Sequence, residues 1–282
     1  MAYEGPTMDL TGSARAAAAG DKLAARAVLD AIQDDVYGLA LRMLGHPADA
    51  EDAAQEVLVI VLTHLGSFRG ESAFRTWVWR IAASHIARVR RGRRETITLE
   101  TLDDRLRTGL REEPSDRPDP EEEALAHELR LRCTEAMILS LDREHRLAYL
   151  LGDVFNLSGE EAAEVLEIDP ATFRKRLSRA RRRLHDFVRA WCGVYDAANP
   201  CRCRGQIDGA IERGILSPDD LYLSMHRVRP ARAALDRAAH EVTELMHLAE
   251  LMRAPGSYLA PATMIANLRE LLDSERLELL RP

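Results

Sequence analysis

The 282-residue chain has few aromatic residues, few cysteines and no long apolar run. Aromatic side chains make up only 5% of it, yet hydrophobic residues together reach 46%. That share is enough to form packed cores, so a wholly disordered chain is excluded. The longest purely aliphatic run, Val57–Leu62, is far shorter than the roughly 20 residues that a membrane-spanning helix needs. We therefore expect no membrane segment.

Export signals and strand patterns are also scarce. The N-terminal residues lack the basic start and apolar core of a secretory signal, so we expect a cytoplasmic protein. In that setting the four cysteines are expected to be free thiols or metal ligands before disulfides. Only Thr96–Thr101 has a faintly strand-like pattern, whereas Ala, Leu, Arg and Glu dominate elsewhere. The composition predicts an all-α fold.

The net charge of −7 argues against a nucleic-acid partner, but this average conceals a strong segregation of charge. Residues 68–94 and 170–190 each have a net charge of +7, and residues 95–123 have a net charge of −7. Two cationic helical stretches on either side of an acidic connector are a local signal for an anionic partner.

Apolar spacing predicts most of the helices. Leu29, Ile32 and Val36 begin a stripe on a helix that ends at Gly45, and Asp49 is the expected N-cap of the next helix. A third helix is expected from about residue 72 to residue 91. Residues 95–123 contain three prolines and many acids, which predicts a flexible linker. Helices are expected again over 124–191, 230–253 and 261–280.

A helix-turn-helix is predicted between residues 156 and 184. Ser158 and Glu161 form a capping box for the first helix, and Asp169-Pro170 starts the second. A helix of this kind fits the major groove of DNA, where its N-terminal residues contact bases. The alternative is a solvated basic helix, or one that docks an acidic protein. The expected base contacts are Thr172, Lys175 and Arg176, and the expected phosphate contacts are Arg174, Arg179 and Arg182.

The third helix has an apolar stripe that includes His85, expected to be a packed core histidine, and a polar side that carries three arginines. The loop before it, 67–75, combines aromatic residues with arginine, which suits stacking on single-stranded bases. The alternative is that the aromatic residues only fill a core, and for Phe74 and Trp77 we favour that interpretation. The polar side consists of Arg80, Ser84, Arg88 and Arg91.

Two motifs carry a family resemblance. Asp49–Val57 followed by Phe68–Ala82 resembles region 2 of extracytoplasmic-function (ECF) sigma factors, and Leu141–Leu184 resembles their region 4. The resemblance implies binding to the β′ clamp helices and β flap of core RNA polymerase, melting of the minus-10 element and reading of the minus-35 element. It divides the chain into region 2 (1–94), an acidic linker (95–123), region 4 (124–190) and a C-terminal helical extension (191–282).

The same resemblance assigns roles to residues. The shared polar face of the second helix would contact polymerase through Asp49, Asp52, Gln55 and Glu56. The minus-10 element would be held by Phe68, Arg69, Glu71, Ser72, Arg80, Ser84, Arg88 and Arg91. Ser84 stands where the family usually has Asn, and Glu167 occupies a turn position where Gly is usual. The sequence leaves open whether an anti-sigma partner exists.

The C-terminal extension contains Cys192, Cys201 and Cys203. Their spacing matches no standard zinc ribbon, but three thiolates within twelve residues could bind a soft ion such as Zn or Cu, with His185 or His226 as a fourth ligand. A thiol redox switch and packed free thiols are the alternatives. Cys133 is expected in a core.

These features favour a transcription initiation factor that needs no cofactor and whose extension docks on the sigma domains and controls them. The alternative is a free-standing helix-turn-helix regulator with a thiol- or metal-sensing tail. A third reading is a thiolate-metal enzyme or a metal buffer built around the tail. The sequence contains no paired acid and base, phosphate-binding glycine loop or nucleophile constellation, so we expect no enzyme.

Overall fold

The computed structural model describes residues 9–89, 97–111, 120–225 and 258–274, and in these residues we find helices and loops but no strand beyond isolated bridges. The all-α prediction is confirmed. The N-terminal bundle contains α1 (Leu10–Ala18), α2 (Lys22–Leu44), α3 (Pro47–Thr63), a 3-10 turn (Leu65–Ser67) and α4 (Phe74–Arg88).

The α2–α3 pair forms the centre of this bundle. Leu29, Ile32 and Val36 are buried, as their spacing predicts. Helix α2 ends where Gly45 takes a left-handed φ of 71°, a conformation open to glycine, and its N–H donates to the carbonyl of Leu41. The prediction that Asp49 is the N-cap of α3 is wrong. Pro47 begins the helix because its fixed φ suits the first position, and Asp49 lies in the first turn.

The helix-turn-helix prediction is confirmed. It lies within a second group of helices: α6 (Pro120–Leu139), α7 (Arg143–Tyr149), a π-helical turn (Leu150–Val154), α8 (Gly159–Val165) and α9 (Pro170–Trp191). Both arms of the Ser158–Glu161 capping box form, and Asp169 accepts from the N–H of Thr172 over 2.9 Å. Between α8 and α9 the chain turns at Glu167, whose φ of 53° costs a non-glycine residue about 1 kcal/mol.

The prediction of a flexible linker over residues 95–123 is wrong for part of that segment. Thr98, within the segment expected to be strand-like, caps α5 (Leu99–Gly109) by accepting from the N–H of Thr101. Leu102 and Leu106, one turn apart, are buried. A composition poor in apolar residues still forms a packed helix when its few leucines share one face and a neighbouring helix covers them.

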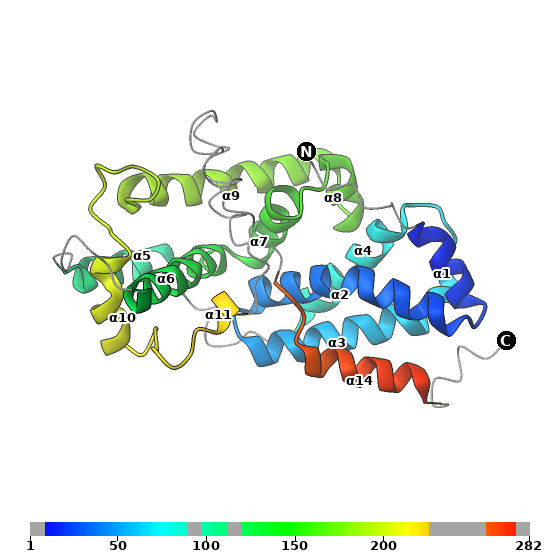
Figure 1. The fold of residues 1–282 in the computed structure, drawn as a ribbon. Helices are drawn as coiled ribbons and strands as arrows, with labels where there is room; N and C mark the ends of the chain where they lie inside the picture. The colour runs from blue at the N-terminus through cyan, green and yellow to red at the C-terminus, as the bar shows by residue number, and fades with distance from the viewer. Residues whose placement is uncertain (1–8, 90–96, 112–119, 226–257, 275–282) are drawn as a thin grey trace.

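The C-terminal extension packs on both groups of helices. After a 3-10 turn (Arg204–Gln206) come α10 (Ile207–Glu212), α11 (Tyr222–Met225) and α14 (Ala262–Asp273). Helix α10 forms a small separate core with α6, whereas α14 lies along α2 and α3 (Figure 1). The helix expected over 261–280 is confirmed as far as Asp273, and the one expected over 230–253 falls outside the described residues.

The N-terminal bundle and the second group of helices share one hydrophobic core. Buried residues of α2, α3 and α4 are continuous with those of α7, α8, α9 and α14. Figure 1 shows α14 on one side of the α2–α3 pair and α7, α8 and α9 on the other. None of the helices in the described ranges has both the length and the apolar character needed to cross a bilayer.

Candidate nucleic-acid interface

Helix α9 separates an apolar side from a cationic side. Phe173, Leu177, Ala180 and Leu184 are buried, as predicted. The expected DNA contacts that are exposed on α9 are Arg174, Lys175, Arg179 and Arg182. Thr172 is half-buried and its hydroxyl donates to Asp169, so it takes part in the helix cap.

One arginine in this cationic run is structural. Arg181 donates through Nε and a terminal nitrogen to the two carboxylate oxygens of Asp153, over 2.8 and 2.6 Å. The Asp153 side chain is only 4% exposed, so this bidentate pair compensates a carboxylate removed from water. Arg181 therefore holds α9 against the preceding helices, and its neighbours are left to face outward.

The loop before α4 contains an aromatic cluster. The ring of Phe68 lies 5.2 Å from that of Phe74 and 5.6 Å from that of Trp77, distances typical of attractive ring pairs. Phe74 is buried, in agreement with its expected core role, whereas Phe68 and Trp77 are half-buried. Of the other loop residues expected at the minus-10 element, Arg69 and Glu71 are exposed and Ser72 is half-buried.

The polar side of α4 faces the second group of helices. Arg80 donates to Glu164 of α8 over 2.9 Å, and Arg176 of α9 pairs with Glu144 of α7 over 2.7 Å. Arg88 donates to the carbonyl of Ser84 over 2.9 Å. A hollow of about 610 Å³ is lined by Arg80, Ser84, Arg88, Glu144, Glu167 and Arg176 among others. Arg91 lies outside the described residues.

Two arginines of α7 hold the same interface. Arg143 donates to the carbonyls of Ala87 and Val89 over 2.6 and 2.7 Å, and so satisfies acceptors at the end of α4. Arg146, which is buried, donates to the carbonyl of Met43 near the end of α2 and to those of Leu139 and Leu141. Sequence reasoning missed both, because an arginine in a short helix carries no signal that its partners belong to distant helix ends.

The polar face of α3 is largely accessible. Asp49, Asp52 and Glu56 are exposed and Gln55 is half-buried. The expectation that His85 is a core histidine is wrong: its side chain is 25% exposed and its Nε2 lies 2.8 Å from a carboxylate oxygen of Glu56. The side chain of His85 faces α3, which presents the carboxylate of Glu56 there.

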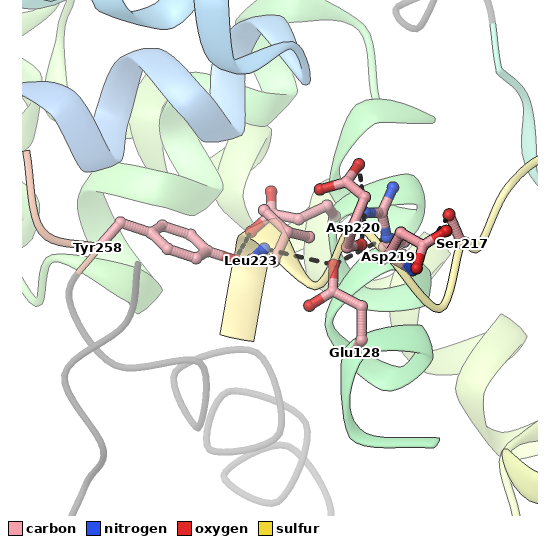
Figure 2. A network of polar contacts seen from close by, with 8 residues as sticks. Glu128, Ser217, Asp219, Asp220, Leu223 and Tyr258 are labelled. Atoms are coloured by element: carbon pink, nitrogen blue, oxygen red, sulfur yellow. Dashed lines mark hydrogen bonds and ion pairs between the residues drawn. The ribbon is translucent and has the colours of Figure 1, made fainter. Parts of the chain in front are cut away.

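The C-terminal extension reaches the sigma-like helices through polar contacts (Figure 2). Glu128 of α6 is fully buried and accepts from Arg132 over 2.8 Å and from the backbone N–H of Leu223 over 3.3 Å. Tyr258, which is also buried, donates to Glu135 over 2.6 Å. Tyr222 donates to Glu51 over 3.5 Å, beside the polar face of α3. The extension is thus tied to both parts of the molecule.

The expected tail ligands do not form a ready metal site. Among the residues that the structure describes, no group of three or more His, Cys, Asp or Glu side chains is arranged to hold a metal ion. His185 lies edge-on to Tyr195, with its Nε2 3.3 Å from the phenol oxygen, and His226 is outside the described residues. All four cysteines are free thiols.

Two family models match the chain. Sigma-70 region 2 matches residues 28–96 and Sigma-70 region 4 matches residues 131–184. These ranges contain the α4 surface and the helix-turn-helix described above, in the order that the sequence motifs predict.

Curated relatives agree with this placement. The chain is 32% identical over 190 residues to the ECF RNA polymerase sigma factor SigE of Mycolicibacterium smegmatis, covering 65% of this chain and 70% of that protein. It is 33% identical over 166 residues to the RNA polymerase sigma-H factor of Pseudomonas aeruginosa, covering 57% of this chain and 84% of that protein. With ECF sigma factor SigW of Bacillus subtilis the identity is 30%, over 60% of this chain and 91% of the relative.

Among solved structures, CnrH in complex with the cytosolic domain of CnrY matches with a TM-score of 0.46 and 21% identity, covering 64% of this chain and 96% of that chain. The classification depends on the two matched regions and on relatives at 30% identity or more that are covered over most of their length. The chain belongs to the ECF family of RNA polymerase sigma factors, which direct core polymerase to specific promoters, so a free-standing repressor or activator is set aside.

Proposed function

We propose that this sigma factor reads the minus-35 element through the cationic side of α9. The exposure of Lys175, Arg174, Arg179 and Arg182 supports this role, since all four lie outside the buried apolar side of the helix. Arg176 joins them once its pair with Glu144 is broken. Arginines at the N-terminal end of such a helix contact base edges, and those further along contact phosphates.

Region 2 supplies the minus-10 contacts in this proposal. The half-buried ring of Phe68, with Arg69 and Glu71 exposed beside it, suits capture of an unstacked base. Arg80 and Arg88 would then hold phosphates of the strand. Core polymerase would contact Asp49, Asp52, Gln55 and Glu56 on α3, a face that is accessible apart from the contact between Glu56 and His85.

The free chain adopts what we call the closed arrangement, in which α4 faces α7, α8 and α9. The single observation that carries this part of the proposal is that Arg80 and Arg176, expected contacts for the two promoter elements, both line one hollow and both pair with carboxylates there. Neither arginine can hold DNA while it is so paired. Binding to polymerase would separate the two regions and release both.

The C-terminal extension stabilises this closed arrangement in our proposal. Helix α14 buries Leu268 and Leu272 on the α2–α3 pair, and Arg269 pairs with Asp30 of α2 over 2.9 Å. Tyr258 contacts Arg42 of α2 and Glu135 of α6, so one side chain bridges the two regions. No cofactor is required for initiation, and we place the activity in the cytoplasm with core polymerase.

Promoter-directed transcription tests these assignments. Promoters would first be selected from random-sequence DNA with core polymerase and the full chain, and initiation on them would then be measured for variants. Arg176→Ala is expected to lose roughly 1–3 kcal/mol of discrimination at one minus-35 base pair. Uniform weakening on all sequences would reduce Arg176 to a phosphate contact. A full chain that supports no selective initiation would refute the proposed function.

A further inference from the structure

All four cysteines of the chain lie together where α6, the end of α9 and the extension meet. Cys133 belongs to α6 and Cys192 directly follows α9. Cys192 and Cys201 pair in an isolated parallel bridge, in which Gly193 N–H donates to the carbonyl of Cys201 over 3.0 Å. Paired strands lie roughly 4.8 Å apart, so the bridge holds these two cysteine backbones side by side.

Three of the four cysteines line one small cavity. Cys133, Cys201 and Cys203 line a cavity of about 80 Å³, together with Leu102, Leu129 and Ala136. Cys192 joins this group through its backbone bridge with Cys201. The expectation that Cys133 is only a core residue missed this relationship.

Two cations accompany the cluster. Arg130 acts electrostatically on Cys203, and Arg202 acts in the same way on Cys201. Metals bind the thiolate form of cysteine, and nearby positive charge offsets the negative charge of a thiolate cluster. Four thiolates around a divalent cation have a net charge of about −2, which two arginines offset.

A redox switch fits this environment less well. Oxidation to a disulfide starts from an accessible thiolate. None of the four cysteines is exposed, since each is half-buried against neighbouring segments, and this limits the access of oxidants to the thiols.

We propose that Cys133, Cys192, Cys201 and Cys203 together bind one Zn²⁺ ion. Four thiols release four protons and form four Zn–S bonds, with no change of oxidation state. A tetrahedral set of four sulfur ligands is a structural zinc site, in which Zn–S bonds are about 2.3 Å long. Since no three such donors converge in the described arrangement, binding requires their side chains to rotate toward the cavity, while the backbone bridge already fixes two of them.

Zinc binding at these four cysteines would link three segments of the chain. An ion held by these four residues would fasten the start of the extension to α6 and to the end of α9. This goes beyond the proposed initiation function and does not depend on it. Because α6 contributes one ligand from a distant part of the chain, the site would form only in the folded protein.

Zinc analysis of the purified full chain tests the proposal. Protein prepared under reducing conditions with added Zn²⁺ and then dialysed should retain one zinc per chain. Cys133→Ser and Cys201→Ser should each lower the retained zinc at least tenfold, and Ser217→Ala, in the extension but outside the cluster, should leave it unchanged. Co²⁺ in place of Zn²⁺ should give thiolate charge-transfer bands and the visible bands of tetrahedral cobalt.

Circular dichroism checks that each variant is folded. Cys133→Ala serves as a second variant that keeps the core apolar. The proposal is overturned if the wild-type chain retains no zinc, or if folded Cys133→Ser and Cys133→Ala both keep one zinc per chain. A Cys192–Cys201 disulfide in freshly reduced, zinc-treated protein would also overturn it. These measurements need no polymerase, so their failure leaves the initiation function standing, and failed initiation would leave the zinc result standing.

Discussion

Arg80 of α4 and Glu164 of α8 form an ion pair across 2.9 Å, although 84 residues separate them in the chain. Arg80 is an expected minus-10 contact and Glu164 lies on the first helix of the helix-turn-helix. The pair therefore joins region 2 of the sigma factor to region 4, and Arg80 is unavailable to DNA while the pair holds.

Neutralising Glu164 should weaken the closed arrangement. Both side chains are partly exposed, at 36% and 45%, so solvent screening limits the pair to about 0.2–1 kcal/mol. Glu164→Gln should raise the affinity of the free protein for single-stranded promoter DNA by up to about fivefold, measured by fluorescence anisotropy. Glu160→Gln, the same charge change on an exposed residue one turn earlier, is the control. Equal gains in both variants would mean that charge alone, not release of Arg80, causes the effect.

Removing Tyr258 should loosen the extension. Its ring is fully buried, with the guanidinium of Arg42 4.5 Å from the ring centroid. Tyr258→Ala should cost about 3–5 kcal/mol, and Tyr258→Phe, which loses the hydrogen bond to Glu135, about 1.5–3 kcal/mol. Urea unfolding and limited proteolysis of the extension measure both. Leu259→Ala changes the adjacent residue, which is 43% exposed, and should have little effect. If the protease cuts the extension of Leu259→Ala as readily as that of Tyr258→Ala, the Tyr258 ring does not anchor the extension.

Arginines on α9 should separate into two classes. Arg179→Ala and Arg182→Ala should each reduce the salt dependence of DNA binding by about one phosphate contact, with stability unchanged within about 0.5 kcal/mol. Arg181→Ala should instead lower the free energy of unfolding by about 1.5–3 kcal/mol, since it removes two hydrogen bonds to the buried Asp153. DNA titrations at several salt concentrations and urea unfolding distinguish them. A stable Arg181→Ala with a reduced salt slope would contradict this division.

The capping box predicts an acid-sensitive helix α8. The Ser158 backbone N–H and then its hydroxyl hold the pKa of the Glu161 carboxyl below its usual range. A lowered folded pKa means that the contribution is complete above the unfolded pKa of about 4.3 and is lost as the pH falls through the lower folded value. Glu161→Gln keeps an acceptor that does not titrate, so its melting temperature should fall less steeply between pH 5 and about pH 3. Glu160→Gln should follow the wild-type curve, and a Glu161→Gln curve parallel to the wild type would refute the assignment.

Much of the local structure was predictable from the sequence. The capping box at Ser158, the Asp169-Pro170 helix start and the buried stripe on α9 were each predicted from residues that follow one another within about four positions. Helix periodicity and cap chemistry act over that range, so a short stretch encodes them. Helix α5 was missed because its two buried leucines gain their apolar partners only from other parts of the fold.

The sequence by itself determined the helical composition, the two family motifs and the charge separation between them. Only the tertiary structure decided that Arg80 meets Glu164, that Arg143 caps α4 and that Cys133 borders the same cavity as cysteines of the extension. The physical reason is range. Local propensities fix each helix and its amphipathic faces, but which faces meet depends on burying the largest apolar area among all helices at once, and polar side chains then acquire partners that no short pattern specifies.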